Sequence, residues 1–281
     1  MRAVSSAPIE RYTESGLIRQ RVSMVSPVTA ADASKRNRFS ATERAVRVDL
    51  AACYRLAAHF RLTDLIYTHI SARVPGPEAH FLINAYGLLF DEIKAGNLVK
   101  VTLDGDIVDD PSGLGINPAG YLIHSAVHRA RHEVGCVMHT HTTAGLAVAA
   151  QKHGLLPLTQ HAMRFTGCLA YHDYEGVALD VDEQQRLVRD LGTNNAMILR
   201  NHGLLTCGPT VHDAFDLMIH LERACQAQVA ALAGGQELVT PPPAVAEKVA
   251  RQFARPGRTA PANAWAALLR MLDRIDPGYR D

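Results

Sequence analysis

The stretch VGCVMHTHTTAG, residues 134–145, combines a buried strand, a chelating pair of side chains and the start of a helix. Residues 134–139 are an apolar run of strand length, and Thr142 is of a type favoured at helix N-caps. We therefore predict a strand that ends at His139 and a helix of small residues capped by Thr142. His-x-His on a strand puts His139 and His141 on one face, where both imidazoles can bind one metal ion.

A third histidine follows a second apolar run. Residues 195–200 predict another buried strand, and His202 comes two residues later, in a tight turn. With His139 and His141 it would make three protein ligands and leave positions for water or substrate, the pattern of a catalytic metal site. The alternative is that all three are turn and core histidines satisfied by hydrogen bonds.

Another set of histidines repeats every four residues. His124, His128 and His132 would share one face of a helix, a spacing that also suits chelation. No carboxylate or thiolate on that helix joins them, and Arg129 and Arg131 lie beside them in the sequence. The favoured interpretation is a solvated helix face.

Helices and strands alternate around these motifs. Ser40 begins a capping box and a helix to about His59, and Thr210 caps a long helix to about Ala233. Residues 171–176 are predicted to be a polar loop. Further elements are expected as strands at 65–74, 80–83, 98–103, 106–108 and 203–207, and as helices at 117–131, 182–191, 244–254 and 262–275. Hairpins mixed with helices indicate an α/β fold around a mixed, largely antiparallel sheet.

The composition excludes several classes of function. With 29 basic and 28 acidic residues the net charge is +1, so no basic surface for nucleic acid is expected. No apolar run reaches the roughly 18 residues that cross a bilayer, and the N-terminus lacks the apolar core of a signal peptide. The five cysteines are odd in number, lack a Cys-x-x-Cys motif and are interpreted as reduced thiols. We expect a cytoplasmic protein that acts on a small molecule, without nucleic-acid or membrane partners.

Six ordered segments together resemble the class II aldolase/adducin family, and the adducin head domain more than the sugar-phosphate aldolases. In chain order they are LIYTHIS (65–71), NAYGLL (84–89), NPAG (117–120), HTH (139–141), YHDYEG (171–176) and LRNHGL (199–204). The similarity covers roughly residues 40–235. We therefore expect an N-terminal arm at 1–39, the family domain at 40–235 and a C-terminal helical extension at 236–281.

The resemblance implies a three-layer αβα sandwich and a cyclic homotetramer with active sites at the subunit interfaces. It implies a divalent metal, Zn²⁺ first and Mn²⁺ or Fe²⁺ as alternatives, on His139, His141 and His202. In the aldolases the metal polarises a carbonyl or enediolate oxygen, and a Tyr of the neighbouring subunit assists proton transfer. Tyr171 is the best match for that Tyr.

Two departures separate the chain from the sugar-phosphate aldolases. Those enzymes carry a catalytic Glu just before the helix that precedes the His-x-His, where this chain has Gly120. Two of their phosphate-binding pairs correspond here to Thr68-His69 and Tyr86-Gly87. Because a phosphate nest needs close backbone approach, the bulky His69 and Tyr86 would hinder it. A sugar-phosphate substrate is therefore not expected.

The charge of the metal site favours a different substrate. Three neutral imidazoles leave the charge of a +2 ion uncompensated, which suits an anionic chelator such as a 2-keto or 2-hydroxy carboxylate. We predict a metal-dependent lyase, of aldehyde-lyase or carboxy-lyase type, that cleaves a carbon–carbon bond in a small carboxylate or carbonyl substrate. Tyr171, His69 and Tyr121 are the candidate catalytic acid/base residues. Two alternatives stay open: a non-heme iron oxygenase on the same scaffold, and a non-catalytic adducin-like interaction module.

Overall fold

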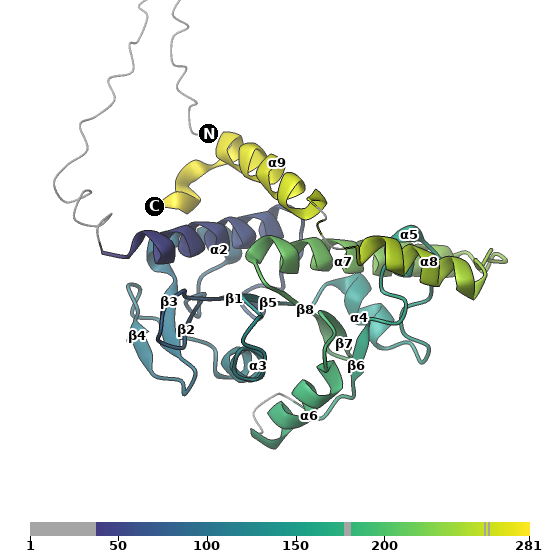
Figure 1. The fold of residues 1–281 in the computed structure, drawn as a ribbon, viewed down its shortest axis with the longest axis horizontal. Coiled ribbons are helices and arrows are strands. Elements are labelled where there is room, and N and C mark those ends of the chain that lie inside the picture. Colours follow the sequence, from purple (N-terminus) through teal and green to yellow (C-terminus); the bar gives the residue numbers. More distant parts are fainter. Residues whose placement is uncertain (1–37, 177–180, 256, 258) are drawn as a thin grey trace, which may run out of the picture. The chain divides into compact units, whose positions relative to one another are not determined.

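A computed structural model describes residues 38–176, 181–255, 257 and 259–281 of the 281-residue chain. Residues 40–281 form one compact unit (Figure 1), which includes the segment 236–281 that was predicted as an extension. The arm predicted at 1–39 lies outside the described residues except for its last two positions. No helix in the described part of the chain is long and apolar enough to cross a membrane.

A mixed sheet forms the middle of this unit (Figure 1). Its strands among the described residues, in their order across the sheet, are β4 (Ile107–Asp109), β3 (Val99–Thr102), β2 (His80–Ile83), β1 (His69–Arg73), β5 (Cys136–Thr140), β8 (Gly203–Gly208), β7 (Ala196–Leu199) and β6 (Ala170–His172). Neighbouring strands are antiparallel except for the parallel pair β6–β7. The largely antiparallel sheet predicted from the sequence is confirmed.

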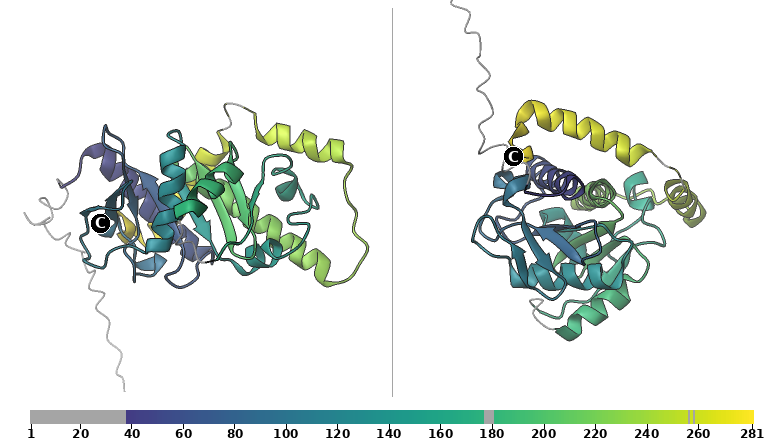
Figure 2. Two further views of the ribbon diagram at one scale, coloured as in Figure 1. Left: turned by 90° about the horizontal axis from the view of Figure 1, so that it is seen from below. Right: turned by 60° about the vertical axis from the view of Figure 1, so that its left-hand side comes forward.

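Helices cover both faces of the sheet, which makes a three-layer αβα sandwich (Figures 1 and 2). On one face lie α2 (Ala41–His59) and α7 (Val211–Ala233), and on the other lie α3 (Pro118–Ala130) and α6 (Val181–Leu191). The other helices pack on α2, on α7 or on one another: α4 (Thr143–Ala149), α5 (Gln160–Met163), α8 (Pro243–Phe253), α9 (Ala260–Ile275), η1 (Phe90–Glu92), η2 (Ala95–Asn97) and η3 (Pro277–Arg280). The predicted αβα fold is confirmed.

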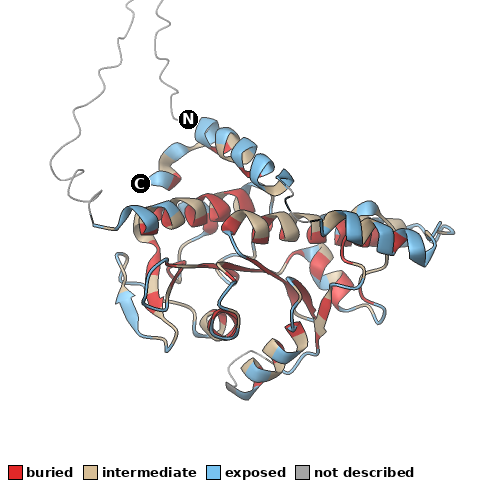
Figure 3. Ribbon diagram, in the orientation of Figure 1, coloured by how far each residue is buried: buried red, intermediate tan, exposed pale blue. Residues whose placement is uncertain are grey.

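Successive residues of β5 are buried on opposite faces of the sheet. Cys136 and Met138 belong to the core on the α2 and α7 side, whereas Val137 packs with Val127 of α3 on the other side. Because side chains alternate along a strand, His139 follows Val137 onto the α3 face. Figure 3 shows the sheet buried between helices whose outer surfaces are exposed.

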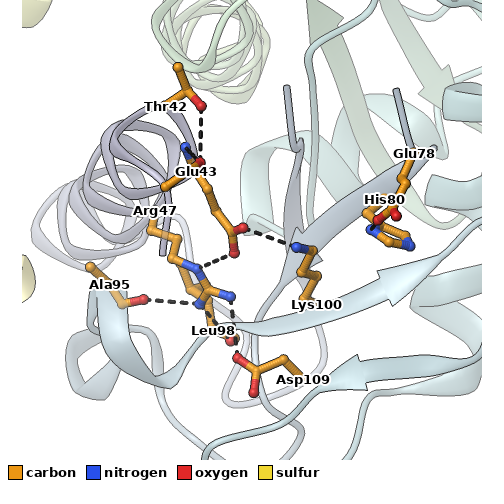
Figure 4. A network of polar contacts seen from close by, with 10 residues as sticks. Thr42, Glu43, Arg47, Glu78, His80, Ala95, Leu98, Lys100 and Asp109 are labelled. Carbon is orange, nitrogen blue, oxygen red and sulfur yellow. Dashed lines mark hydrogen bonds and ion pairs between the residues drawn. The ribbon is translucent and has the colours of Figure 1, made fainter. Parts of the chain in front are cut away.

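A buried arginine anchors α2 to the edge of the sheet (Figure 4). Arg47 is fully buried; its guanidinium donates to Glu43 at 2.9 Å and lies 3.5 Å from a carboxylate oxygen of Asp109 in β4. It also donates to two backbone carbonyls just before β3, and Glu43 pairs with Lys100 of β3 at 3.0 Å. Removing one member would leave a buried charge unpaired, which is strongly destabilising.

The hydroxyl of Tyr54, in α2, lies where β1 and β2 separate. The two strands pair at Ala72 and Arg73 of β1. Closer to the start of β1, the Tyr54 hydroxyl accepts hydrogen bonds from the backbone N–H of Ile70 at 2.8 Å and of Asn84 at 3.2 Å. The phenol oxygen thus takes the place of the ladder hydrogen bonds that the two strands do not make with each other.

Two sequence-based boundaries are corrected by the structure. The strand predicted at 65–74 begins only at His69, because Leu65 has a left-handed backbone with φ 47°, which an extended strand excludes. The polar loop predicted at 171–176 begins with residues of β6, which pairs with β7. Backbone hydrogen bonds hold this edge strand, so it needs no apolar alternation to form.

The interpretation of the histidines that repeat every four residues is wrong. Helix α3 ends at Ala130, so His132 does not share a helix face with His124 and His128. Those two side chains are fully buried against the sheet, not solvated. They tolerate burial because the hydroxyl of Ser71 in β1 forms hydrogen bonds to both rings.

Candidate metal centre

Three imidazoles meet at one end of β5, β7 and β8. His139 lies in β5, His141 follows that strand, and His202 lies in the turn that joins β7 to β8. One nitrogen atom of each ring lies within 4.8 Å of the others. They are the three residues predicted as metal ligands. Within the described residues they are the one group of at least three His, Cys, Asp or Glu side chains close enough to share an ion.

The turn between β7 and β8 brings His202 to the other two histidines. Asn201 has a left-handed backbone with φ 56°, which Asn tolerates better than most residues. At the next position but one, Gly203, a Cβ atom would lie 2.4 Å from the backbone oxygen of Thr140. Glycine therefore permits the close approach of β8 to the end of β5 that places the third imidazole.

Hydrogen bonds on the outer nitrogens fix the tautomers of two rings. His139 Nδ1 lies 2.9 Å from the carbonyl oxygen of Leu204, and His141 Nδ1 lies 3.0 Å from a carboxylate oxygen of Asp64. Both oxygens are acceptors, so in neutral rings both Nδ1 atoms carry the hydrogen. The two Nε2 atoms, 2.8 Å apart, then face each other with lone pairs. Such an arrangement is stable with a positive charge between the lone pairs.

Burial keeps two of the three rings, His139 and His202, neutral at pH 7. Burial, followed by the neighbouring His202 and His141, lowers the pKa of His139 well below its ordinary value. Burial and the nearby His141 also lower the pKa of His202 to about 4. Both rings are therefore neutral at pH 7, the state in which imidazole binds metal. The donor set fits a divalent ion such as Zn²⁺.

Asp64 is a site residue that sequence reasoning missed. Its carboxylate holds the outer nitrogen of His141, an arrangement that orients a metal-binding ring and makes it more basic. Asp64 lies 77 residues before His141 and immediately before the left-handed Leu65, which turns the chain toward β1. The antiparallel pairing of β1 with β5 creates this contact, and no local sequence pattern marks it.

His69 lies directly opposite His139 in the β1–β5 pair, so both side chains point to the same face. It is 3% exposed, and neither ring nitrogen has a hydrogen-bond partner among the described residues. A Cβ atom on Gly120 would lie 2.4 Å from the His69 ring, so the imidazole fills the space over that glycine. Burial, with a contribution from His141, lowers the pKa of His69 to about 4. His69 is thus a neutral, unpartnered imidazole on the metal-centre side of the sheet.

The other two candidate acid/base residues bond to backbone groups. The hydroxyl of Tyr171 accepts a hydrogen bond from the N–H of Leu155 at 3.0 Å, and the Arg200 guanidinium lies 4.3 Å from the centre of its ring. Tyr121 donates to the carbonyl of Leu103 at 2.6 Å. The catalytic roles of Tyr171 and Tyr121 stay predictions.

A different tyrosine lies near His202. Tyr174, which is 54% exposed, has its ring centre 6.3 Å from that of His202. It also lines an open polar pocket of about 520 Å³ together with Lys152, Arg200 and Asp173. The metal centre therefore has a solvent-accessible neighbour pocket with two basic side chains and one acidic side chain.

Comparison with known proteins agrees with this fold. Residues 48–229 match the model of the class II aldolase and adducin N-terminal domain. The solved structure of an aldolase II superfamily protein from Pseudomonas syringae is 59% identical, with TM-score 0.84, over 88% of this chain and 99% of that chain. That of L-fuculose 1-phosphate aldolase from Glaciozyma antarctica PI12 is 26% identical, with TM-score 0.74, over 89% of this chain and 98% of that chain.

The chain is also similar to an adducin. Alpha-adducin of Mus musculus is 42% identical over 271 residues, which span 92% of this chain but 36% of the adducin. The match to the family model covers more than half of the chain, and the Pseudomonas syringae structure extends it to most of the compact unit. This chain belongs to the class II aldolase and adducin family.

Proposed function

We propose that the protein is a divalent-metal-dependent lyase, of aldehyde-lyase or carboxy-lyase type, that acts on a small carboxylate or carbonyl substrate. The observation that carries this proposal is the pair of facing Nε2 lone pairs on His139 and His141, with His202 beside them. Zn²⁺ is the ion we expect, with Mn²⁺ and Fe²⁺ as alternatives that imidazole also binds. When bound, such an ion supplies a Lewis acid for a substrate oxygen.

Charge around the centre supports an anionic substrate. Imidazoles bind a metal in their neutral form, so three imidazole ligands do not compensate a charge of +2. Lys152 and Arg200 add two positive charges to the pocket beside Tyr174, against one negative charge from Asp173. A 2-keto or 2-hydroxy carboxylate, which offers two oxygens and a negative charge, suits these groups.

A sugar phosphate suits the site less well. The resemblance aligns His69 with a phosphate-binding position of the sugar-phosphate aldolases, and Gly120 with their catalytic Glu. Here the His69 ring fills the space over Gly120, so this backbone is not open to a phosphate. The sugar phosphate named for the Glaciozyma antarctica aldolase is therefore not the substrate we propose for this protein.

His69 is the acid/base residue that the geometry favours. A neutral imidazole can accept a proton at one ring nitrogen and return it to the substrate. Its position opposite His139 puts it on the same side of the sheet as the metal centre, and neither nitrogen is committed to another partner among the described residues. Tyr171 and Tyr121 would act only after giving up the backbone bonds they make in the single chain.

The assembly and the location are part of the proposal. A homotetramer with active sites at its interfaces follows from the family resemblance, and in it Tyr171 would serve a neighbouring subunit. A cytoplasmic location is supported by the five cysteines, all of which are free and four of which are buried.

Metal analysis tests the function most directly. We expect about one divalent ion per chain in the purified protein, measured by inductively coupled plasma mass spectrometry, and loss of that ion in His139→Ala and His202→Ala. The control is His153→Ala, which removes an exposed histidine outside the cluster. The loaded protein is then assayed for carbonyl products or CO₂ with keto acids, hydroxy acids and sugar phosphates. Turnover of sugar phosphates in preference to both acids would contradict the proposed substrate.

One competing function has an observation in its favour. The 42% identity with alpha-adducin extends over almost the whole chain, which supports an adducin-like interaction module without catalysis. A parent protein that holds no ion, even after reloading, would favour this module. Bound iron with substrate-dependent oxygen uptake would instead favour an oxygenase.

A further inference from the structure

A pocket lies where α9 packs on α7 and on the end of α2, on the side of these helices that faces away from the sheet (Figure 1). Its volume is about 410 Å³, within the range of sites that hold small molecules. Its lining residues, taken from the described part of the chain, include neither a metal-centre histidine nor a residue of the sheet. This α7–α9 pocket is therefore separate from the metal centre.

Most of the wall of the α7–α9 pocket is apolar. Six buried or half-buried side chains contribute to it: Phe60, Phe215, Ile219, Trp265, Leu268 and Met271. None of the six is strongly exposed, so this apolar surface is recessed and does not form a protruding face. A protein partner typically covers a broad patch, roughly 800 Å² on each side. A recessed pocket suits the apolar part of a small molecule instead.

Small side chains of α9 leave the α7–α9 pocket open to solvent. Ala264 and Ala267 both line it and are exposed, so they lie at its mouth. Trp265, between them in the sequence, is 6% exposed and lies deeper, with its ring centre 5.7 Å from that of Phe215. Larger residues at the two alanine positions would occupy the entrance.

The polar part of the lining comes from α7, and its free charge is positive. The carboxylate of Asp216 is already paired with Arg164 at 2.7 Å. His220 Nδ1 donates to the backbone carbonyl of Asp216 at 2.6 Å, and burial lowers the pKa of His220, so its ring is neutral at pH 7. Arg223, almost one turn further along α7, is exposed at the pocket and has no ion pair with any described residue. An anionic group complements this guanidinium.

We propose that the α7–α9 pocket is a second binding site, for a small molecule with an apolar body and an anionic head, such as a medium-chain carboxylate. The apolar body packs between α7 and α9 against Trp265, and the head group pairs with Arg223 at the mouth. Such a ligand joins the two helices and needs no metal ion. The inference is therefore independent of the proposed lyase function.

The single tryptophan of the chain makes binding measurable, because Trp265 lines the pocket. Full-length protein is titrated with decanoate while the fluorescence of Trp265 is followed. We expect a saturable change in emission, with about one decanoate bound per chain by isothermal titration calorimetry. Emission that does not respond to decanoate would overturn the proposal.

The role of the anionic head is tested with Arg223→Gln and a second probe, decanol, which has the same apolar chain and no charge. We expect Arg223→Gln to raise the Kd of decanoate by about 2–5-fold, as for an exposed ion pair, and to leave that of decanol unchanged. The matched control is Arg270→Gln, which removes an exposed arginine of α9 outside the pocket lining. Equal decanoate affinity in the two variants would contradict recognition of the anion by Arg223.

The place of binding is tested by filling the mouth of the pocket. We expect Ala264→Leu to weaken decanoate by more than about 10-fold, because the added side chain occupies the entrance. Ala266→Leu, at an exposed position of α9 outside the lining, should bind normally. Ala267→Leu replaces Ala264→Leu if that variant does not fold.

Two further results would contradict a small-molecule site at this place. The metal-free His139→Ala protein should bind decanoate as tightly as the parent, so loss of the Trp265 response there would place the carboxylate at the metal centre instead. Light scattering should give the same molar mass for Ala264→Leu and Ala266→Leu. A smaller assembly in Ala264→Leu alone would mean that this surface binds a second copy of the chain.

Discussion

Two clusters of histidines lie on the same side of one sheet and differ in what their inner nitrogens meet. In the metal centre, acceptors hold the outer nitrogens of His139 and His141, so two lone pairs converge. In the second cluster, the Ser71 hydroxyl lies between His124 and His128 and satisfies one nitrogen of each. Close spacing of histidines therefore does not by itself make a chelating site. The partners of the nitrogens decide whether lone pairs are left for an ion.

The largest expected difference between the clusters is in metal affinity. His139→Ala removes one of the converging lone pairs, so we expect the affinity for Zn²⁺ to fall by more than about 100-fold, because outer partners of ligands alone are worth about 10–100-fold. His128→Phe removes a ring whose Nε2 atom is bonded to Ser71, and should leave Zn²⁺ affinity unchanged. Titration against a chromophoric chelator measures both. Equal losses of Zn²⁺ affinity in the two variants would contradict this difference between the clusters.

His69, which packs against Gly120, lies between the clusters: it is opposite His139 in the sheet, and its ring centroid is 6.0 Å from that of His124. Gly120→Ala puts a Cβ atom 2.4 Å from the His69 ring, and we expect it to lower the free energy of unfolding by about 1–3 kcal/mol. His69→Ala removes the obstructing ring, so the double variant should recover part of this loss, with a coupling energy of about 0.5–3 kcal/mol. Urea unfolding of the four proteins in the cycle gives the coupling. Strict additivity would mean that the ring does not fill this space in solution.

The outer acceptor of His141 has a smaller expected effect than the ligands. Asp64→Ala leaves the three imidazoles in place but frees the His141 ring to turn, so we expect Zn²⁺ affinity to fall by about 10–100-fold. Asp91→Ala, which removes an exposed carboxylate of η1, is the control. The same chelator titration applies. If Asp64→Ala binds Zn²⁺ as tightly as the control variant does, the Asp64 carboxylate does not contribute to the metal centre.

The second cluster predicts a change of stability in acid. In the metal-free protein, His128 stays neutral down to a pKa of about 3, whereas in the unfolded chain it takes up a proton below about pH 6.5. Its contribution to stability is therefore complete above pH 6.5 and falls by up to about 1.4 kcal/mol per pH unit as the pH drops toward 3. His128→Phe should show a flatter pH dependence in urea unfolding between about pH 5.5 and 4. Parallel curves would indicate that His128 is protonated in the folded protein.

Local sequence patterns predicted the parts of the fold that depend on local physics. The run before His139 and the run before His202 are apolar throughout, so their strands and the turns after them were found. The caps at Ser40 and Thr210 are side-chain hydrogen bonds within one turn, and both helices begin where predicted. The three histidines lie together because each follows such a strand or turn.

The residues that sequence reasoning missed depend on contacts between distant segments. Asp64 reaches His141 through strand pairing, and Tyr174 reaches His202 from the chain after β6. The spacing of His124 and His128 showed that they share a helix face. It did not show that this face packs on the sheet, where Ser71 forms hydrogen bonds to both rings. Tertiary packing, which local periodicity does not encode, decided whether that face was solvated or buried.

The Tyr54 hydroxyl has a consequence for how the sheet opens. It replaces ladder hydrogen bonds at one end of β1 and β2, so β2, β3 and β4 join the rest of the sheet through fewer backbone bonds than a full ladder would give. Weakly joined edge segments open at a lower free energy than the whole protein, and their amide hydrogens exchange sooner. The strands that carry the metal-centre histidines lie on the other side of this separation. The edge of the sheet can thus open locally while the metal-centre imidazoles stay in position.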